Sequence, residues 1–321
     1  GGLFLPSAEA PAPGAAVPDA GRAGSGLISV ICPTSAARRC FHRLLWLCFE
    51  CQCYAAKELV VVETCEDDPA EFFVEKMRAD RRLIYRHYRV PNEAWSVGLK
   101  RNLACYFASG EVIAHFDDDD LYASCYLEDM VRFMRSPHDV LALHLQSGCN
   151  HDLLGTILAE MGHQHERRKE DESEPAPSST SPELILGSFG AACAKLSSWH
   201  TLALPTGSWA NFDAMQSSSD GDSLQSQMYG WGFSMLYLRA AWEAVPFLHI
   251  DLGEDFDFVA CLRRLSLPLV LVPDTRGICA HTHHSGNTTG GCAERRGKKL
   301  RHVPTRLAAF APMYERAAKG S

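Results

Sequence analysis

Four consecutive aspartates at positions 117–120 form the group of side chains in this 321-residue sequence with the clearest chemical potential. Neighbouring carboxylates raise one another's pKa and disfavour ionisation, and a divalent cation removes that penalty. Oxygen ligands of this kind suit Mg²⁺ or Mn²⁺. In an extended backbone Asp117 and Asp119 point to the same side and can share one ion. The run therefore predicts a metal and phosphate site, with a solvated acidic turn as the alternative.

Two cations and an amide, Lys100, Arg101 and Asn102, precede the acidic run. Cationic side chains at this place could neutralise phosphate oxygens or pair with the aspartates. The alternative is the exposed start of a helix. Read together with the aspartates, they favour a phosphate-binding site.

A second acidic pair, Glu254-Asp255, stands beside Phe256 and Phe258. Apolar surroundings raise the pKa of a carboxylate, whereas a helix N-terminus lowers it. The pair is therefore a candidate general base, and an acidic first turn of a helix is the alternative.

Three histidines, His281, His283 and His284, stand close together further along. Neutral imidazole is a common ligand of transition ions such as Mn²⁺. Our candidates for the metal are His281 and His283, and which histidine meets it stays open.

Apolar runs alternate with helical patterns in the segments that must position these side chains. Helices are predicted over 36–56 and 97–109. The runs that predict buried strands are 27–32, 58–63, 83–88, 111–116 and 269–272. This alternation predicts an α/β fold with a mostly parallel central sheet and helices on both faces. Ligands bind outside the carboxyl ends of such strands, so the ends of the first, second and fourth strands are expected to form one site.

Composition marks segments outside this pattern. Residues 1–26 are rich in Gly, Ala and Pro and predict a disordered tail, and 163–182 predicts a disordered insertion. The ordered domain is expected over 27–290. A basic tail follows over 291–321, with a terminal helix predicted over 304–318.

Bulk composition excludes some functions. The chain is 46% hydrophobic, enough for a sizeable core. Its 39 acidic and 31 basic residues give a net charge of −8, which disfavours nucleic acid as a partner. No apolar run approaches the ~20 residues of a membrane span. The 13 cysteines lack the spacing of a disulfide framework, so we expect a reducing, cytoplasmic location.

Together these segments resemble the inverting GT-A (Rossmann-like) glycosyltransferases of glycosyltransferase family 2, over 27–289 without the insertion. Residues 28–34 resemble the family's first strand, and 58–63 its second. Residues 100–102 with 108–119 are similar to its Arg-Asn helix and Asp-x-Asp motif, the most specific part of the likeness. Residues 253–255 resemble its Glu-Asp motif.

The resemblance implies a metal-dependent transfer of a sugar from a nucleoside-diphosphate sugar, with UDP-sugar expected, to a hydroxyl of a carbohydrate, protein or lipid acceptor. Asp255, with Glu254 beside it, would deprotonate the acceptor. Mn²⁺ or Mg²⁺ would be held by Asp119 with His281 and His283. Glu63 stands where the family normally has Asp. The residues expected to bind the nucleotide sugar are Pro33, Thr34, Glu63, Lys100, Arg101, Asn102, Asp117 and Asp118.

Two other functions are compatible with this fold. A nucleotidyltransferase would need a glycine-rich loop after the first strand, and residues 33–39 contain no glycine. A binding module without turnover is the second alternative, against which stand the three carboxylates Asp117, Asp119 and Asp255.

Overall fold

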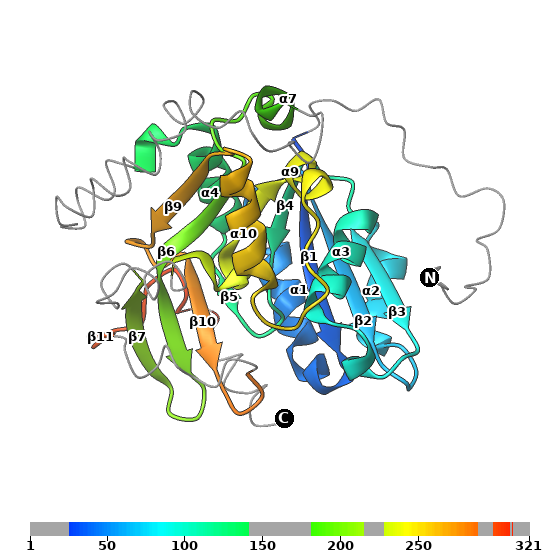
Figure 1. Cartoon of the computed structure of the whole chain (residues 1–321). Helices are drawn as coiled ribbons and strands as arrows, with labels where there is room; N and C mark the ends of the chain where they lie inside the picture. The colour runs from blue at the N-terminus through cyan, green and yellow to red at the C-terminus, as the bar shows by residue number, and fades with distance from the viewer. Residues whose placement is uncertain (1–25, 141–180, 215–227, 288–297, 309, 311–321) are drawn as a thin grey trace.

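The computed structural model describes residues 26–140, 181–214, 228–287, 298–308 and 310. Its strands form one sheet with the main order β11-β7-β6-β8-β4-β1-β2-β3 (Figure 1). The disordered segments predicted over 1–26 and 163–182 lie almost wholly outside the described residues. Among the described residues, no helix is long and apolar enough to cross a membrane.

The first part of the chain forms the parallel half of the sheet. Strands β1 (Ile28–Ser35), β2 (Lys57–Thr64), β3 (Leu83–Tyr88) and β4 (Val112–His115) pair in the order β4-β1-β2-β3, all parallel. The apolar side chains of β1 and of the middle of β2 are buried, as expected for strands covered on both faces. The four strands predicted for this region are therefore confirmed.

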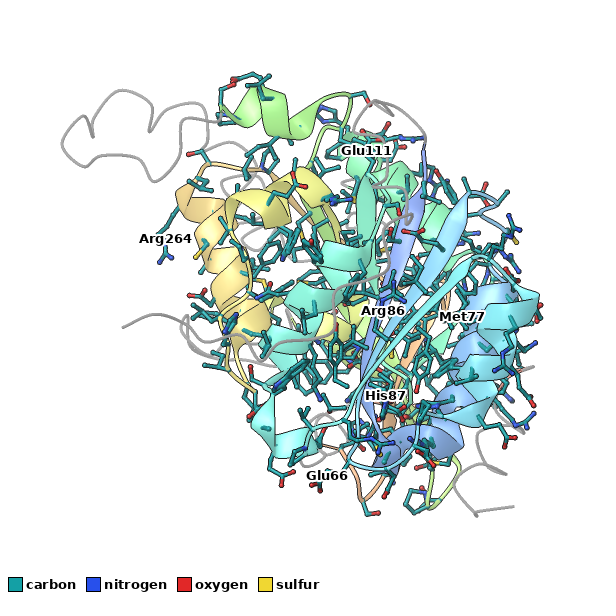
Figure 2. All side chains as sticks on the ribbon, turned by 90° about the vertical axis from the view of Figure 1, so that its right-hand side faces the viewer. Glu66, Met77, Arg86, His87, Glu111 and Arg264 are labelled. Carbon is teal, nitrogen blue, oxygen red and sulfur yellow. The ribbon has the colours of Figure 1, made fainter. Side chains whose placement is uncertain are left out.

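Helices cover both faces of this half, as neighbouring residues of β3 demonstrate. The Tyr85 ring packs on Phe73 of α2 (Glu71–Ala79), with centroids 5.3 Å apart. The next residue points to the opposite face, where the Arg86 guanidinium lies 4.9 Å from the Phe107 ring of α3 (Val97–Phe107). Figure 2 shows Arg86 on this edge strand and Met77 on α2. The predicted α/β class with helices on both faces is confirmed.

The second half of the sheet is largely antiparallel, so the sheet as a whole is mixed and not purely parallel. Strand β6 (Cys193–Ala203) pairs antiparallel with β7 (Ser208–Asp213) and β8 (Leu236–Leu238), and β8 pairs antiparallel with β4. Among the described strands, β9 (Leu269–Pro273) and β10 (Cys279–His283) pair parallel with β6. The short β5 (Leu121–Tyr122) pairs with β10. A tight turn at Gly207, which has a φ of 64°, joins β6 to β7.

The chain after position 290 contributes to the sheet as well. Strand β11 (Lys298–Lys299) pairs with β7, so part of the predicted basic tail belongs to the domain. Of the helix predicted over 304–318, the described residues 305–308 form turns.

Two further features of the described helices bear on the site. The helix predicted over 36–56 is the 3₁₀ helix η1 (Ala36–Phe41) followed by α1 (His42–Glu50). Helix α3 starts where predicted because Ser96 Oγ accepts a hydrogen bond from the Leu99 amide. The remaining elements are η2 (Asn92–Ala94), α4 (Tyr126–Arg135), α7 (Pro182–Leu186), η4 (Gly232–Ser234), α9 (Arg239–Ala244) and α10 (Glu254–Arg264).

Strand direction brings the predicted site residues to one edge. The carboxyl ends of β4, β1 and β2 are neighbours because these strands are parallel and adjacent. Strand β8 enters the sheet antiparallel to β4, so η4, which precedes it, lies at the same edge. Here the Tyr122 hydroxyl receives a hydrogen bond from the Asp117 amide and donates one to the Phe233 carbonyl.

Candidate active site

A cleft of about 590 Å³ opens at this edge. It lies between the ends of β1 and β4, the start of α3, the η4 turn and the start of α10. The sequence-predicted residues that line it are Pro33, Thr34, Lys100, Arg101, Asp117, Asp118, Glu254, Asp255 and His281. Glu63, Asn102, Asp119 and His283 do not line it. Segments more than 200 positions apart in the sequence thus line one cleft.

The four aspartates point to different partners. Asp117 is one-third exposed in the cleft, with an oxygen 3.8 Å from Arg101. Asp118 accepts a 2.6 Å hydrogen bond from the Thr34 hydroxyl. Asp120 is fully buried and both of its oxygens lie 3.0 Å from His281 Nδ1. Asp119 faces a third direction, toward His284. The run is therefore a folded cluster of countered charges, not a solvated acidic turn.

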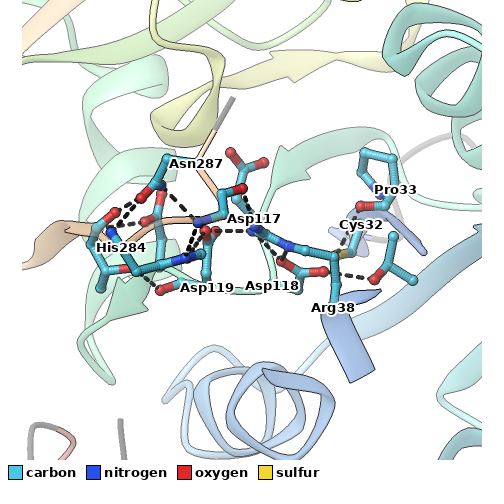
Figure 3. Close-up of polar contacts among 12 residues, drawn as sticks. Cys32, Pro33, Arg38, Asp117, Asp118, Asp119, His284 and Asn287 are labelled. Carbon is cyan, nitrogen blue, oxygen red and sulfur yellow. Dashed lines mark hydrogen bonds and ion pairs between the residues drawn. The ribbon is translucent and has the colours of Figure 1, made fainter. Parts of the chain in front are cut away.

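Arg38, which the sequence analysis did not select, joins Asp118 and Asp119 (Figure 3). Its Nε and Nη2 bind one oxygen of Asp118 at 2.9 and 2.7 Å, and Nη2 also forms an ion pair with Asp119. Burial works to raise the pKa of Asp119, but the His284 hydrogen bond and the Arg38 charge outweigh it and lower that pKa to about 2. Asp119 is therefore ionised at neutral pH.

Asp117 differs from Asp119 in its electrostatics. Burial, together with the charges of the other three aspartates, raises its pKa to about 7, despite the opposing effect of Arg101. Burial likewise raises the pKa of Asp118 to about 6 against the effect of Arg38. A positive charge placed beside these two carboxylates would favour their ionised forms. The pair therefore suits a cation that also binds phosphate.

Arg101 links the acidic cluster to the second acidic pair. Its side chain is 6% exposed, and Nη1 forms a short ion pair with Glu254, whose side chain is 5% exposed. Burial raises the pKa of Glu254 although Arg101 opposes this. Glu254 is thus occupied as the counter-charge of Arg101 and is poorly placed to accept a proton from a substrate.

Asp255 is the freer member of the pair. Its Oδ1 accepts a 2.7 Å hydrogen bond from the Phe256 amide, and no side chain or backbone group of the described residues is seen to hydrogen-bond to Oδ2. Gly232 packs directly on it, since a Cβ there would lie 3.1 Å from Oδ2. Of the two predicted catalytic residues, Asp255 has the geometry of a base open to the cleft.

The histidines are distributed differently from the prediction. His281 is paired with Asp120, whose charge outweighs burial and raises the His281 pKa to about 9. His283 has both ring nitrogens buried without a hydrogen-bond partner. His284, which was not chosen, places Nε2 2.8 Å from Asp119 Oδ2. Of the three histidines, His284 is therefore the one in contact with Asp119.

A turn after β10 redirects His284. Strand alternation places His281 and His283 on one face, but the strand ends at His283. The side chain of Asn287 then holds the turn, since its Nδ2 donates to the Thr282 carbonyl at 2.9 Å and its Oδ1 accepts from the His284 amide. His284 points at Asp119 as a result (Figure 3).

The donor atoms at Asp119 fit Mn²⁺ or Mg²⁺ in part. A carboxylate and an imidazole 2.8 Å apart suit Mn²⁺. Within the described residues, no group of three or more His, Cys, Asp and Glu side chains forms a metal cluster. Metal sites that use one or two protein carboxylates complete the coordination shell of the ion with water and substrate phosphate. Asp119 and His284, next to Asp117 and Asp118, are the residues that would hold an ion.

Two predicted nucleotide-binding residues instead stabilise the fold. Glu63 is fully buried, where it pairs with Arg39 at 2.8 Å and accepts a hydrogen bond from Tyr85. Asn102 joins α3 to the segment after α9, because its side chain bonds the Phe247 backbone and the Trp242 indole. Neither side chain lines the cleft, although both were expected to bind the nucleotide.

The loop that carries Glu254 and Asp255 rests on α3 at a glycine. The Gly98 amide donates to the Ile250 carbonyl at 3.1 Å, and Asp251 accepts from the Val97 amide at 3.1 Å. A Cβ on Gly98 would lie 1.8 Å from the Leu248 carbonyl oxygen. Only glycine permits this approach of two backbones.

We expect Gly98→Ala to destabilise the protein by about 1–3 kcal/mol, as overpacking does. In an unobstructed helix the same change stabilises by about 0.5–1 kcal/mol, so the sign of the effect tests the contact. Urea unfolding gives the free energy. Gain of stability in the variant would disprove close docking of the loop on α3.

Comparison with known proteins adds a family match and distant structural likenesses. Residues 29–176 match the family model described as Glycosyl transferase family 2. No match was found among curated proteins. Similar solved structures include S. aureus TarS 1–349 in complex with UDP-GlcNAc, at 16% identity and a TM-score of 0.47, covering 81% of this chain and 60% of that one. Another is the mannosyltransferase PcManGT from Pyrobaculum calidifontis in complex with GDP-Man and Mn²⁺, at 14% identity and a TM-score of 0.41, covering 91% and 73%.

The matched segment contains β1 to β4, the acidic run and α3. The resemblance to glycosyltransferase family 2 is therefore confirmed over residues 29–176, and the segment has the α/β fold expected of a glycosyltransferase domain. The chain spans about 60% of the length of TarS 1–349. Glu254, Asp255 and the histidines lie beyond the matched segment, so their place in the cleft comes from the structure.

Proposed function

We propose that the chain transfers a sugar from a nucleoside-diphosphate sugar to an acceptor hydroxyl by a single inverting displacement. The observation that carries the proposal is the convergence in one cleft of Asp117 and Asp118 from the acidic run, the cations Lys100 and Arg101, and Asp255. A transferase of this kind must hold a diphosphate at one end and a base at the other. We assign the diphosphate to the wall lined by the ends of β1 and β4, and the base to the wall lined by the start of α10.

Asp255 serves as the general base. Its Oδ2 faces the cleft beside Gly232 and is available to accept the proton of an acceptor hydroxyl. The acceptor oxygen then forms a bond to the anomeric carbon as the bond from that carbon to the diphosphate breaks. Arg101 fixes the neighbouring Glu254, which keeps the first turn of α10 in place during the step.

The other wall receives the donor. Pro33 and Thr34, at the end of β1, border the side where the nucleoside would lie, and UDP is the nucleotide that we expect. Lys100 and Arg101 supply positive charge for the leaving diphosphate. A divalent ion on Asp119 and His284 would further neutralise the negative charge that develops on the diphosphate. Arg38, already on Asp118 and Asp119, keeps this part of the wall ordered.

Metal dependence gives the experiment that tests the proposal. We expect release of nucleoside diphosphate from one member of a panel of UDP-, GDP- and dTDP-sugars with Mn²⁺ or Mg²⁺, and loss of release with EDTA. Asp119→Asn should lower turnover about 10²-fold or more, because one carboxylate ligand is lost. Asp139→Asn, an exposed aspartate outside the cleft, is the control and should match the wild type. Turnover that is unaffected by EDTA and by Asp119→Asn would contradict the metal site.

A further inference from the structure

A buried lysine lies behind the wall of the cleft. Lys195 on β6 is 0% exposed, and its Nζ donates to the carbonyl oxygens of Met228 at 2.7 Å and Gly230 at 2.8 Å. No carboxylate of the described residues forms an ion pair with this ammonium. Burial lowers the pKa of Lys195 to about 8, against the charge of Asp255. An apolar side chain would fill this position without desolvating a charge, so the contribution of Lys195 lies in the two carbonyls that it holds.

The Gly230 carbonyl immediately precedes a strained residue, Trp231, and the Met228 carbonyl lies two positions further back. Trp231 has φ 75° and ψ 62°, the left-handed conformation that bulky residues rarely adopt. Such a conformation persists only where the surrounding contacts hold it in place. Two hydrogen bonds from one ammonium to the residues just before Trp231 provide such a contact.

The turn is also tied to the catalytic groups. Gly232 follows Trp231, and a Cβ at Gly232 would lie 3.0 Å from both Arg101 Nη1 and Asp255 Cβ. The position of the turn therefore determines how closely Trp231 approaches the base.

The Trp231 side chain lines the cleft and is supported from behind. Its ring centroid lies 5.5 Å from that of Trp199 and 6.2 Å from that of Phe212. On another side it meets His281 at 5.7 Å. A half-buried aromatic ring with an apolar backing presents a rigid surface on which the C–H face of a sugar ring can pack.

We propose that Lys195 is a positioning residue, which holds the Met228 and Gly230 carbonyls and so keeps Trp231 in place as the platform for the acceptor's sugar ring beside Asp255. The proposal deepens the transferase function proposed above and rests on it for the identity of the ligand. It names the acceptor class as a glycoside.

The first experiment measures backbone hydrogen exchange, which requires no turnover. Lys195→Met keeps the length and volume of the side chain and removes its donors. We expect amides of residues 229–234 to exchange at least tenfold faster, with β1 and β2 unchanged. Lys57→Met is the matched control, because Lys57 is also buried and donates to two backbone carbonyls, Gln52 and Tyr54, away from the cleft. Unchanged exchange at residues 229–234 in Lys195→Met would show that the two hydrogen bonds from Lys195 do not hold the turn in place.

The second experiment is a kinetic double-mutant cycle with Trp231→Ala, using a panel of methyl glycosides as acceptors. Lys195→Met should raise the acceptor KM at least tenfold, while UDP binding stays within twofold of wild type. In the Trp231→Ala background the same change should have no further effect on KM. If the effects of the two substitutions on the acceptor KM multiply in the double variant, the positioning role is wrong. The same holds if Lys57→Met raises the acceptor KM as much as Lys195→Met does.

Failure of the transferase proposal would be seen separately, as wild-type protein that consumes no donor. Binding of the same methyl glycosides is then measured by saturation-transfer NMR on wild type, Lys195→Met and Trp231→Ala. This measurement tests whether Trp231 is the platform for the sugar ring. Binding that is lost in both variants supports it, and binding that is the same in all three excludes it.

Discussion

Replacing Asp255 with Asn is expected to lower kcat for sugar transfer by about 10²- to 10⁴-fold, the range that general bases contribute. Asparagine keeps the shape of the side chain and the oxygen that accepts the Phe256 amide at 2.7 Å, but it cannot take a proton from the acceptor. The donor wall is formed by other elements, so the Kd of the nucleotide sugar should stay within about threefold of wild type. Steady-state kinetics and donor titration measure the two quantities.

Asp257→Asn is the matched control for this change. Asp257 stands in the same first turn of α10 but does not line the cleft. Its variant should retain wild-type turnover within about twofold. If Asp255→Asn keeps more than a tenth of the wild-type kcat, the assignment of the base is wrong.

Arg101→Met should destabilise the protein by about 3–5 kcal/mol, because it leaves the buried Glu254 carboxylate without its partner. Asp117 loses its nearest cation as well. Urea unfolding followed by circular dichroism gives the free energy. In the double variant Arg101→Met/Glu254→Met most of the loss should be recovered, since two apolar side chains replace the buried pair.

An exposed ion pair offers the comparison. Arg82 pairs with Asp80 at 2.6 Å, with side chains 39% and 23% exposed, and pairs of this kind contribute about 0–1 kcal/mol. Arg82→Met should therefore have little effect on the unfolding free energy. A loss in Arg101→Met no larger than that in Arg82→Met would show that the Arg101–Glu254 pair does not hold α3 to α10.

The parallel half of the fold follows from sequence patterns because its strands are covered on both faces and read as unbroken apolar runs. The sequence patterns do not predict strand β6, for a physical reason. It carries the buried Lys195 and the serines Ser197 and Ser198 among its apolar residues, so neither an apolar run nor a clean alternation marks it. Its antiparallel pairing with β7 and β8 made the sheet mixed.

The candidate site was predictable where the residues bring their chemistry to the end of an element, as Asp117 does after β4 and Asp255 does at the start of α10. Side chains that reach the site from distant parts of the sequence were not predictable. Arg38 lies 80 positions from Asp118 in a segment without a distinctive pattern, and Glu63 has carboxylate chemistry but points into the core. His284 depends on a turn held by Asn287, which strand alternation does not foresee.

The most direct test of the account is proton NMR of the anomeric signals when the wild-type protein is mixed with Mg²⁺, each nucleotide sugar and the methyl glycoside acceptors. The account predicts that the anomeric signal of one donor disappears and a new glycosidic signal of opposite configuration replaces it. The Asp255→Asn protein should leave the same donor intact. A product that retains the donor's configuration, or wild-type protein that neither binds nor consumes any donor, would contradict it.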